Sequence, residues 1–139
     1  SGFPGMKVIQ FAFDSREESD YLPHNYEKNC VVYTGTHDND TLCGWYKVLD
    51  PEDLKLSQKY MNNANTPKRQ IHWDFIRLAL ASVADLCIIP LQDYLGLGSE
   101  ARINTPSTLG KNWRWRMKQG CLTKELADRI RELTTLYGR

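Results

Sequence analysis

The chain has 139 residues, which is long enough for one domain with a core of its own. Apolar residues make up 41% and charged residues 25%, a globular composition that excludes disordered, collagen-like and membrane-spanning classes. The 18 basic and 17 acidic residues leave a net charge of +1, so charge alone attracts neither nucleic acid nor an anionic membrane surface. We therefore predict no nucleic-acid partner and no membrane partner.

The cysteines are widely spaced and form no Cys-x-x-Cys pair: Cys30, Cys43, Cys87 and Cys121. Zinc-ribbon and redox motifs therefore have no support, and we expect reduced thiols with a structural role. Such thiols are typical of the cytosol or the plastid stroma. We predict a cytoplasmic protein, or a stromal one in a plant, with no cofactor and no metal site.

The first predicted element is a strand over residues 6–13, a nearly continuous apolar run with β-branched and aromatic side chains between Pro-Gly and Asp-Ser pairs. A polar loop over residues 15–29 follows, and its unusual length indicates a functional or lid-like segment. Residues 30–36 (CVVYTGT) form the second predicted strand.

Three helices are predicted next. The first begins at Asp40 or Thr41, because a capping side chain precedes apolar residues at helical spacing. Pro51 opens the second, over residues 51–61, since a proline in the first turn loses no needed hydrogen bond. An apolar stripe over residues 69–84 predicts the third.

Residues 86–91 (LCIIPL) predict a third strand that Pro90 closes, and the glycine-rich segment after it predicts loops and short turns. Thr123 then caps a terminal amphipathic helix. Alternating strands and helices predict an α/β fold with a parallel sheet that is buried on both faces.

Polar residues follow each predicted strand: Asp14 after the first, residues 37–40 after the second, and Gln92, Asp93 and later Asn104 after the third. In parallel α/β folds, catalytic groups gather at the C-terminal ends of the strands. The pattern therefore predicts that these residues converge on one site.

The run T-H-D-N-D at residues 36–40 concentrates an imidazole, two carboxylates and an amide at a strand end. We interpret Asp40 as part of the cap of the following helix. Asp38 and His37 are the functional candidates, because a carboxylate can stabilise the positive charge on an anomeric carbon while a histidine donates to a sugar hydroxyl. A metal site of the HD-type phosphohydrolases is an alternative, although those ligands lie on helical bundles and this pair follows a strand.

The run from Trp113 to Arg116 (WRWR) has the residue types of a patch for single-stranded nucleic acid. We favour a core plug with arginine stems packed over it, because a single cluster in a neutral chain is weak support for such a partner. Trp45, Tyr46 and Trp73 are likewise expected in the core instead of in a sugar platform.

The chain resembles the closing third of amylomaltases, the disproportionating 4-alpha-glucanotransferases, in five ordered runs: GFPGMKVIQFAF, YLPHNY, VVYTGTHDNDT, LGLGSEARINTPS and NWRWR. The resemblance covers nearly the whole chain except roughly residues 47–68. It implies a (β/α)8 barrel with its active site at the C-terminal face, in which the three predicted strands are the sixth, seventh and eighth. Residues 1–139 would then be a single partial domain, the last three βα units of a catalytic barrel.

That family transfers α-1,4-glucan segments by a retaining mechanism, with an Asp nucleophile, a Glu acid/base and a further Asp that steadies the distorted sugar. The resemblance implies that Asp38 is this last residue and that His37 binds the sugar beside it. It also implies a glucan contact for Asn104, with Asp14 as a further candidate. The expected partner is an α-1,4-glucan or a maltooligosaccharide.

In that family the nucleophile and the acid/base belong to the fourth and fifth strands, which precede residue 1. We therefore expect this chain alone to be inactive in glucan transfer. Three strands leave a barrel open, so we also expect self-association or pairing with the missing N-terminal part of the barrel. The alternative hypothesis is a non-catalytic carbohydrate-binding or assembly fragment.

Overall fold

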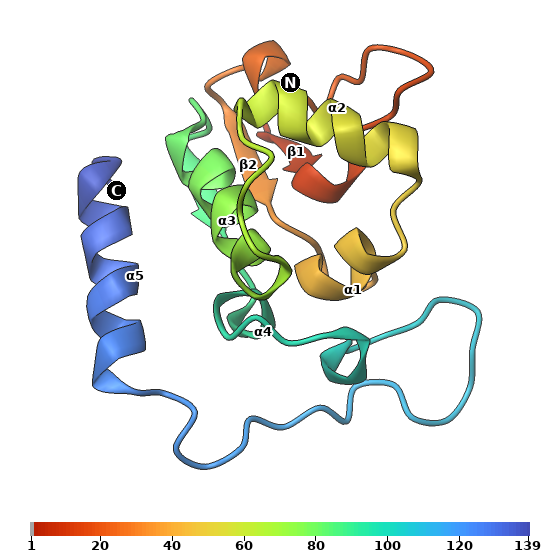
Figure 1. The fold of residues 1–139 in the computed structure, drawn as a ribbon, viewed down its shortest axis with the longest axis vertical. Coiled ribbons are helices and arrows are strands. Elements are labelled where there is room, and N and C mark those ends of the chain that lie inside the picture. Colours follow the sequence, from red (N-terminus) through yellow and green to blue (C-terminus); the bar gives the residue numbers. More distant parts are fainter. Residues whose placement is uncertain (1) are drawn as a thin grey trace.

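The computed structural model describes residues 2–139, and its centre is one sheet of three parallel strands (Figure 1). The strands are β1 (Gly5–Val8), β2 (Cys30–Tyr33) and β3 (Leu86–Ile88), in the order β1-β2-β3. In their register, Val31 lies between Met6 and Leu86. The prediction of a parallel α/β unit is therefore confirmed.

Within residues 2–139, five α-helices and four 3-10 turns accompany the sheet. The helices are α1 (Leu42–Lys47), α2 (Pro51–Met61), α3 (Ile71–Ala81), α4 (Leu91–Tyr94) and α5 (Lys124–Leu136), and the 3-10 turns are Ile9–Phe11, Pro23–Asn25, Lys68–Gln70 and Ser99–Ala101. Figure 1 shows α1, α2 and α3 gathered around the sheet, while a long segment without helix or strand leads to α5 beside α3. Among residues 2–139, no helix has both the length and the apolar character needed to cross a membrane.

The predicted helix starts are confirmed by their caps. The Thr41 side chain accepts a hydrogen bond from Gly44 N at 3.1 Å, and the Thr123 side chain accepts one from Leu126 N at 3.1 Å. Asp50 caps α2 directly before Pro51, as its carboxylate accepts from Glu52 N at 3.0 Å. Each cap satisfies a backbone N–H that the first helical turn leaves without a partner.

The first strand is shorter than the predicted residues 6–13, because the chain leaves the sheet after Val8 and turns through Ile9–Phe11. A tertiary contact explains the turn: Gln10 is buried, and its Nε2 donates to the carbonyl oxygen of Asp40 at 2.7 Å. The turn also buries Ala12 and Phe13 in the core.

The other two strands also end early. β2 stops at Tyr33 because the buried Thr34 turns its hydroxyl to Asp93. β3 stops at Ile88, and Pro90, which has no N–H for a sheet ladder, precedes the first residue of α4.

The third helix spans Ile71–Ala81 instead of residues 69–84, with a 3-10 turn before it. Ser82 ends it, because its backbone is extended and its hydroxyl donates to Ala79 O at 2.8 Å. A serine side chain that binds the backbone in this way competes with helical hydrogen bonding.

The core lies between the helices and one face of the sheet, and Phe75 of α3 is at its centre. Phe75 is fully buried and contacts the rings of Phe13, Trp45 and Tyr46 at centroid distances of 5.1 to 5.8 Å. Aromatic pairs of this kind contribute about 0.5–1.5 kcal/mol each beyond their buried area. With Trp73 5% exposed, the core placement of Trp45, Tyr46 and Trp73 is confirmed.

The opposite face of the sheet is open, so the predicted burial on both faces is wrong for residues 2–139. Side chains alternate along a strand, so Met6 and Leu86 point away from the row that contains the buried Val32. Met6 is 58% and Leu86 52% exposed, because no element of the described chain packs on them. β1 and β3 each also leave one edge unpaired in this part of the chain.

All four cysteines are free thiols, in agreement with the prediction of reduced cysteines. Burial raises the pKa of the Cys43 and Cys87 thiols to about 11. Both thiols therefore stay protonated and weakly nucleophilic at neutral pH, which suits a structural role.

Candidate functional site

The turn after β2 folds around the side chain of Asn39. Its Oδ1 accepts hydrogen bonds from Thr36 N at 2.8 Å and from Thr36 Oγ1 at 2.9 Å, and Asn39 N donates to Thr36 O at 3.1 Å. This closure places His37 and Asp38 at the tip of the turn, where their side chains are 54% and 49% exposed. Both are therefore accessible to a ligand.

The flanks of the turn are held by close backbone approach and by Asp40. A Cβ on Gly35 would lie 2.5 Å from Gln10 Nε2, so glycine is what lets Gln10 reach Asp40 O. The Asp40 carboxylate accepts from Thr41 N at 2.8 Å and from Ser99 Oγ at 2.7 Å. Thr41 is the capping residue of α1, so the predicted cap network is present but Asp40 only supports it.

Asp93 of α4 fixes the buried base of the same turn. One carboxylate oxygen accepts from Leu42 N at 2.8 Å and the other from Thr34 Oγ1 at 2.7 Å. Burial raises the pKa of Asp93 to about 6, although both hydrogen bonds favour the ionised form. This carboxylate joins α4 to β2 and α1, and its oxygens already have protein partners.

Three of the four predicted site residues meet at the tip. Asn104 Nδ2 donates to Asp38 Oδ1 at 2.6 Å, and His37 Nε2 lies 3.3 Å from Asp38 Oδ2. Hydrogen bonds to an ionised carboxylate are stronger than those between neutral groups. The structure therefore brings together an exposed carboxylate, an amide and an imidazole from two distant parts of the chain.

Arg102 belongs to this cluster, and the sequence did not single it out. Its Nη2 donates to Asp38 O at 2.7 Å, and its Nε donates to Asn104 O at 2.9 Å. The only local signal was its position two residues before Asn104. Nothing in the sequence showed that the guanidinium would reach a residue 64 positions away.

Trp113 also lies at the tip, so its predicted role as a core plug is wrong. Its side chain is 57% exposed and rests on His37, with ring centroids 5.0 Å apart and an angle of 35° between the ring planes. The cause is a left-handed backbone (φ 62°) whose N–H donates to Ile103 O, which turns the indole outward. Non-glycine residues in this conformation concentrate at functional sites.

Asp14 does not join the cluster, and its predicted place at a strand end is wrong because β1 ends at Val8. Its carboxylate accepts from Arg16 Nε at 2.9 Å and from Arg16 N at 3.0 Å. These contacts hold the pKa of Asp14 at about 2. The next residue, Ser15, is bound to Asp53 of α2, so this part of the loop is tied to that helix.

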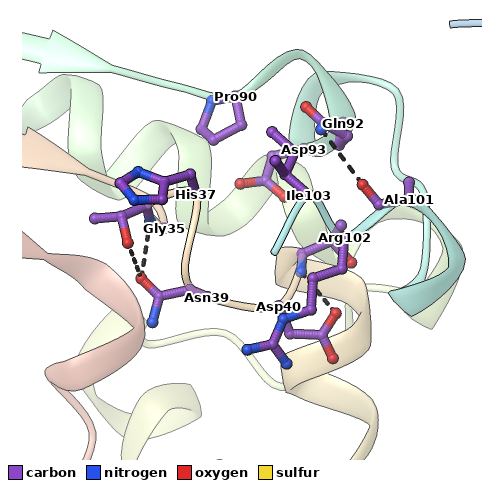
Figure 2. Close-up of a pocket in the computed structure, with 12 residues that line it drawn as sticks. Gly35, His37, Asn39, Asp40, Pro90, Gln92, Asp93, Ala101, Arg102 and Ile103 are labelled. Carbon is purple, nitrogen blue, oxygen red and sulfur yellow. Dashed lines mark hydrogen bonds between the residues drawn. The ribbon is translucent and has the colours of Figure 1, made fainter. Parts of the chain in front are cut away.

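A pocket of about 70 Å³ lies between the turn and the segment after β3. Figure 2 shows His37 and Asn39 on one side of it, with Gln92 and Ala101 opposite. A space of this size suits a few ordered waters. Within residues 2–139, no group of three or more His, Cys, Asp or Glu side chains is placed to hold a metal ion.

Comparison with known proteins matches residues 1–123 to a family model described as 4-alpha-glucanotransferase. The chain is 52% identical to the 4-alpha-glucanotransferase of Clostridium butyricum, over 100% of this chain and 28% of that protein. It is 48% identical to the chloroplastic/amyloplastic 4-alpha-glucanotransferase of Arabidopsis thaliana, over 99% of this chain and 24% of that protein.

Comparison with solved structures supports the same family. An amylomaltase from Streptococcus agalactiae in complex with acarbose superposes with a TM-score of 0.92 at 38% identity, over 99% of this chain and 28% of that one. The amylomaltase of Corynebacterium glutamicum, at 14% identity and a TM-score of 0.68, shows the fold alone, over 94% of this chain and 25% of that one. The predicted origin of the three strands, part of a (β/α)8 barrel, is confirmed by the first of these matches. The chain therefore belongs to the 4-alpha-glucanotransferase family and spans about a quarter of the length of the relatives it matches.

Proposed function

We propose that this chain supplies the carboxylate that stabilises the transition state of α-1,4-glucan transfer, and that this group is Asp38. The observation that carries the proposal is the position of Asp38, half exposed at the C-terminal end of a parallel strand and oriented by Asn104. Active sites of (β/α)8 barrels form at this end of the strands. A fixed negative charge there favours the oxocarbenium-like state of a sugar.

His37 and Asn104 would bind the hydroxyls of the same sugar, and the substrate class would be an α-1,4-glucan or a maltooligosaccharide. Both side chains adjoin the Asp38 carboxylate, so a sugar against that carboxylate would also touch them. The Streptococcus agalactiae relative is a complex with acarbose, an oligosaccharide in which a basic nitrogen replaces one glycosidic oxygen. We assign the same ligand class to this chain.

Residues 1–139 alone would bind glucan without transferring it. A retaining mechanism needs a nucleophile and an acid/base about 5–5.5 Å apart. Near Asp38, the carboxylates of Asp40 and Asp93 already accept hydrogen bonds from protein donors. The chain would thus be a partial domain, the last three βα units of a catalytic barrel. The alternative of an HD-type phosphohydrolase is not supported, because those enzymes are helical bundles and this chain belongs to another family.

The test uses a hybrid enzyme in which residues 1–139 replace the matching segment of the Clostridium butyricum 4-alpha-glucanotransferase, which is 52% identical. We expect the hybrid to release glucose from maltotriose and the isolated chain to release none. Asp38→Asn should lower kcat of the hybrid about 100- to 1,000-fold, the cost of losing one electrostatic stabiliser. Asp20→Asn, at an exposed carboxylate away from the turn, is the matched control and should keep full activity. Full activity in Asp38→Asn would refute the proposal.

Assembly is a second role that the exposed sheet favours. The open face carries the apolar side chains of Met6 and Leu86, and β1 and β3 each have a free edge in residues 2–139. Water-exposed apolar faces and unpaired strands favour association. The chain would pair with itself or with the N-terminal part of the barrel. Light scattering should show a species larger than 16.1 kDa, and a monodisperse monomer would contradict this.

For location, we propose the cytoplasm, or the plastid stroma for a plant protein. The four free thiols suit a reducing compartment, and the Arabidopsis relative is described as chloroplastic/amyloplastic.

A further inference from the structure

Arg102 holds the two halves of the Asp38 cluster together. Its guanidinium donates to the backbone carbonyls of Asp38 and Asn104, at 2.7 and 2.9 Å. The side chains of the same two residues are joined by the 2.6 Å hydrogen bond from Asn104 to Asp38. Arg102 therefore fixes the backbone on both sides of the contact that orients the carboxylate. Figure 2 shows its side chain reaching from the segment after Ala101 toward the turn.

Few hydrogen bonds other than these fix Asn104 against the turn. The segment from Arg102 to Thr123 contains no helix or strand. Its neighbours bind within the segment: Thr105 N donates to Asn112, and Trp113 N donates to Ile103 O. The hydrogen bonds that fix Asn104 relative to Asp38 are thus those of its own amide and of Arg102, and the ring of Trp113 against His37 is a further contact between this segment and the turn.

An arginine is needed for this geometry. The guanidinium is planar and presents its N–H donors in a fixed fork, so one side chain can bind two carbonyls at once. The ammonium of a lysine is a single point on a flexible stem. Among residues 2–139, no carboxylate forms an ion pair with Arg102, so both of its hydrogen bonds serve the backbone.

We propose that Arg102 is a positioning residue: it sets the place of the Asp38 carboxylate and of the Asn104 amide against the glucan. The proposal rests on the proposed function of Asp38 and deepens it. Arg102 touches neither the reacting atoms nor the sugar, and it acts through the two residues that it fixes.

Arg139 provides a matched control. Its guanidinium also binds backbone carbonyls, those of Leu80, Ser82 and Ala84 at 2.8 to 2.9 Å. Leu80 lies in the last turn of α3, and Ser82 and Ala84 lie between α3 and β3, so all three are at the end of the sheet opposite the turn. Arg139→Lys removes the same kind of contact without touching the Asp38 cluster.

The first experiment measures kinetics in the hybrid enzyme. Arg102→Lys should lower kcat for maltotriose about 10- to 100-fold, because a displacement near 1 Å has a cost of this order. KM should change less than kcat, since the lost interaction acts in the transition state. Arg139→Lys should leave both constants within about twofold, as expected for a substitution remote from the site. A higher KM with unchanged kcat would make Arg102 a substrate contact and overturn the proposal.

A double-mutant cycle separates positioning from an independent effect. If Arg102 acts by placing the Asp38 carboxylate, Arg102→Lys should cost less than about threefold in an Asp38→Asn background. Fully additive losses would overturn the proposal. Urea unfolding of each variant identifies any loss that is caused by misfolding.

A second readout does not depend on glucan transfer. In the 139-residue chain, the Asn104 side-chain amide should show slow hydrogen exchange by NMR, because its hydrogen bond to Asp38 is fixed. Arg102→Lys should speed this exchange and shift both amide proton signals, while Arg139→Lys should not. Unchanged Asn104 signals in Arg102→Lys would overturn the positioning role even if Asp38 proves essential. Full activity of Asp38→Asn would instead remove the proposed function and leave this result interpretable.

Discussion

The turn after β2 has an exposed tip and a buried base, and each carries a carboxylate. At the tip, the Asp38 side chain is 49% exposed and is held by Asn104 and His37. At the base, Asp93 is 2% exposed and is bound by Thr34 and Leu42. A buried carboxylate has an electrostatic cost of desolvation and needs protein hydrogen bonds, so its role is structural. An exposed carboxylate can interact with a positive charge on a substrate. Substitutions at the base should therefore change stability, and those at the tip activity.

The largest stability effect is expected from Asp93→Ala. It leaves the Leu42 N–H and the Thr34 hydroxyl buried without a partner, so the free energy of unfolding should fall by about 3 kcal/mol. Asp38→Ala should change it by less than about 0.5 kcal/mol, as is usual at exposed positions. Urea unfolding of the 139-residue chain measures both, and equal losses would break the comparison.

The pH dependence of stability at Asp93 tests this comparison between the buried and the exposed carboxylate more sharply. The pKa of Asp93 is about 6 in the folded chain against 3.8 for a free side chain. Between these values the folded state keeps a proton that the unfolded state has released, so stability falls as the pH rises through this window. The loss approaches about 3 kcal/mol, at about 1.4 kcal/mol per pKa unit. The side chain that replaces the carboxylate in the Asp93→Asn variant cannot titrate. As the pH rises through this window, the stability of the variant relative to wild type should therefore rise by this amount.

The measurement is urea unfolding of both proteins at about pH 4 and about pH 7. The quantity to compare is the difference in unfolding free energy between the two proteins, because the contribution of His72 to stability changes with pH in the opposite direction. Burial and the nearby Arg129 lower the pKa of His72 to about 4, so its contribution is lost as the pH falls. Both proteins contain His72 and its effect cancels. A difference that stays constant with pH would contradict the account of Asp93.

A smaller effect is expected from Gly35→Ala on the flank of the turn. The new Cβ would displace the Gln10 side chain, which lies 2.5 Å from that point, and break its bond to Asp40 O. The cost should be about 1 kcal/mol, the usual net value of one hydrogen bond. Gly5→Ala, where a Cβ meets nothing within 4 Å, is the control in thermal unfolding. Equal effects would show that Gln10 does not fix the turn.

The smallest effect is expected from Asp14→Asn in the hybrid enzyme. Asp14 is bound to Arg16 and not to the cluster, so kcat/KM for maltotriose should stay within about twofold. A tenfold loss would restore Asp14 as a glucan contact and extend the functional surface beyond the tip.

Local sequence patterns were sufficient to predict much of the fold and the part of the site that lies in the T-H-D-N-D run. The caps at Thr41 and Thr123 were predictable because a cap needs only one side chain and the next turn of helix. The T-H-D-N-D run was visible because its polar residues are consecutive. Asn104 was singled out by its place after the third predicted strand and by the resemblance, and the structure shows it bound to Asp38.

The remaining features depend on contacts between distant residues. The end of β1 is set by the bond between Gln10 and Asp40, which no local pattern contains. Arg102 and Trp113 join the tip from a segment without regular structure, where hydrophobic periodicity carries no information. The Trp113 prediction failed because a tryptophan in sequence looks the same whether a turn points it inward or outward.

The most direct test of Asp38 compares a ligand with a basic nitrogen, which can take up a proton, with a ligand that has none. Isothermal titration calorimetry would measure binding of acarbose and maltotetraose to the hybrid enzyme and to its Asp38→Asn variant. If the carboxylate stabilises positive charge at the reacting sugar, the substitution should weaken acarbose at least about tenfold more than maltotetraose, a difference of about 1.4 kcal/mol. Equal weakening of the two ligands would contradict this role.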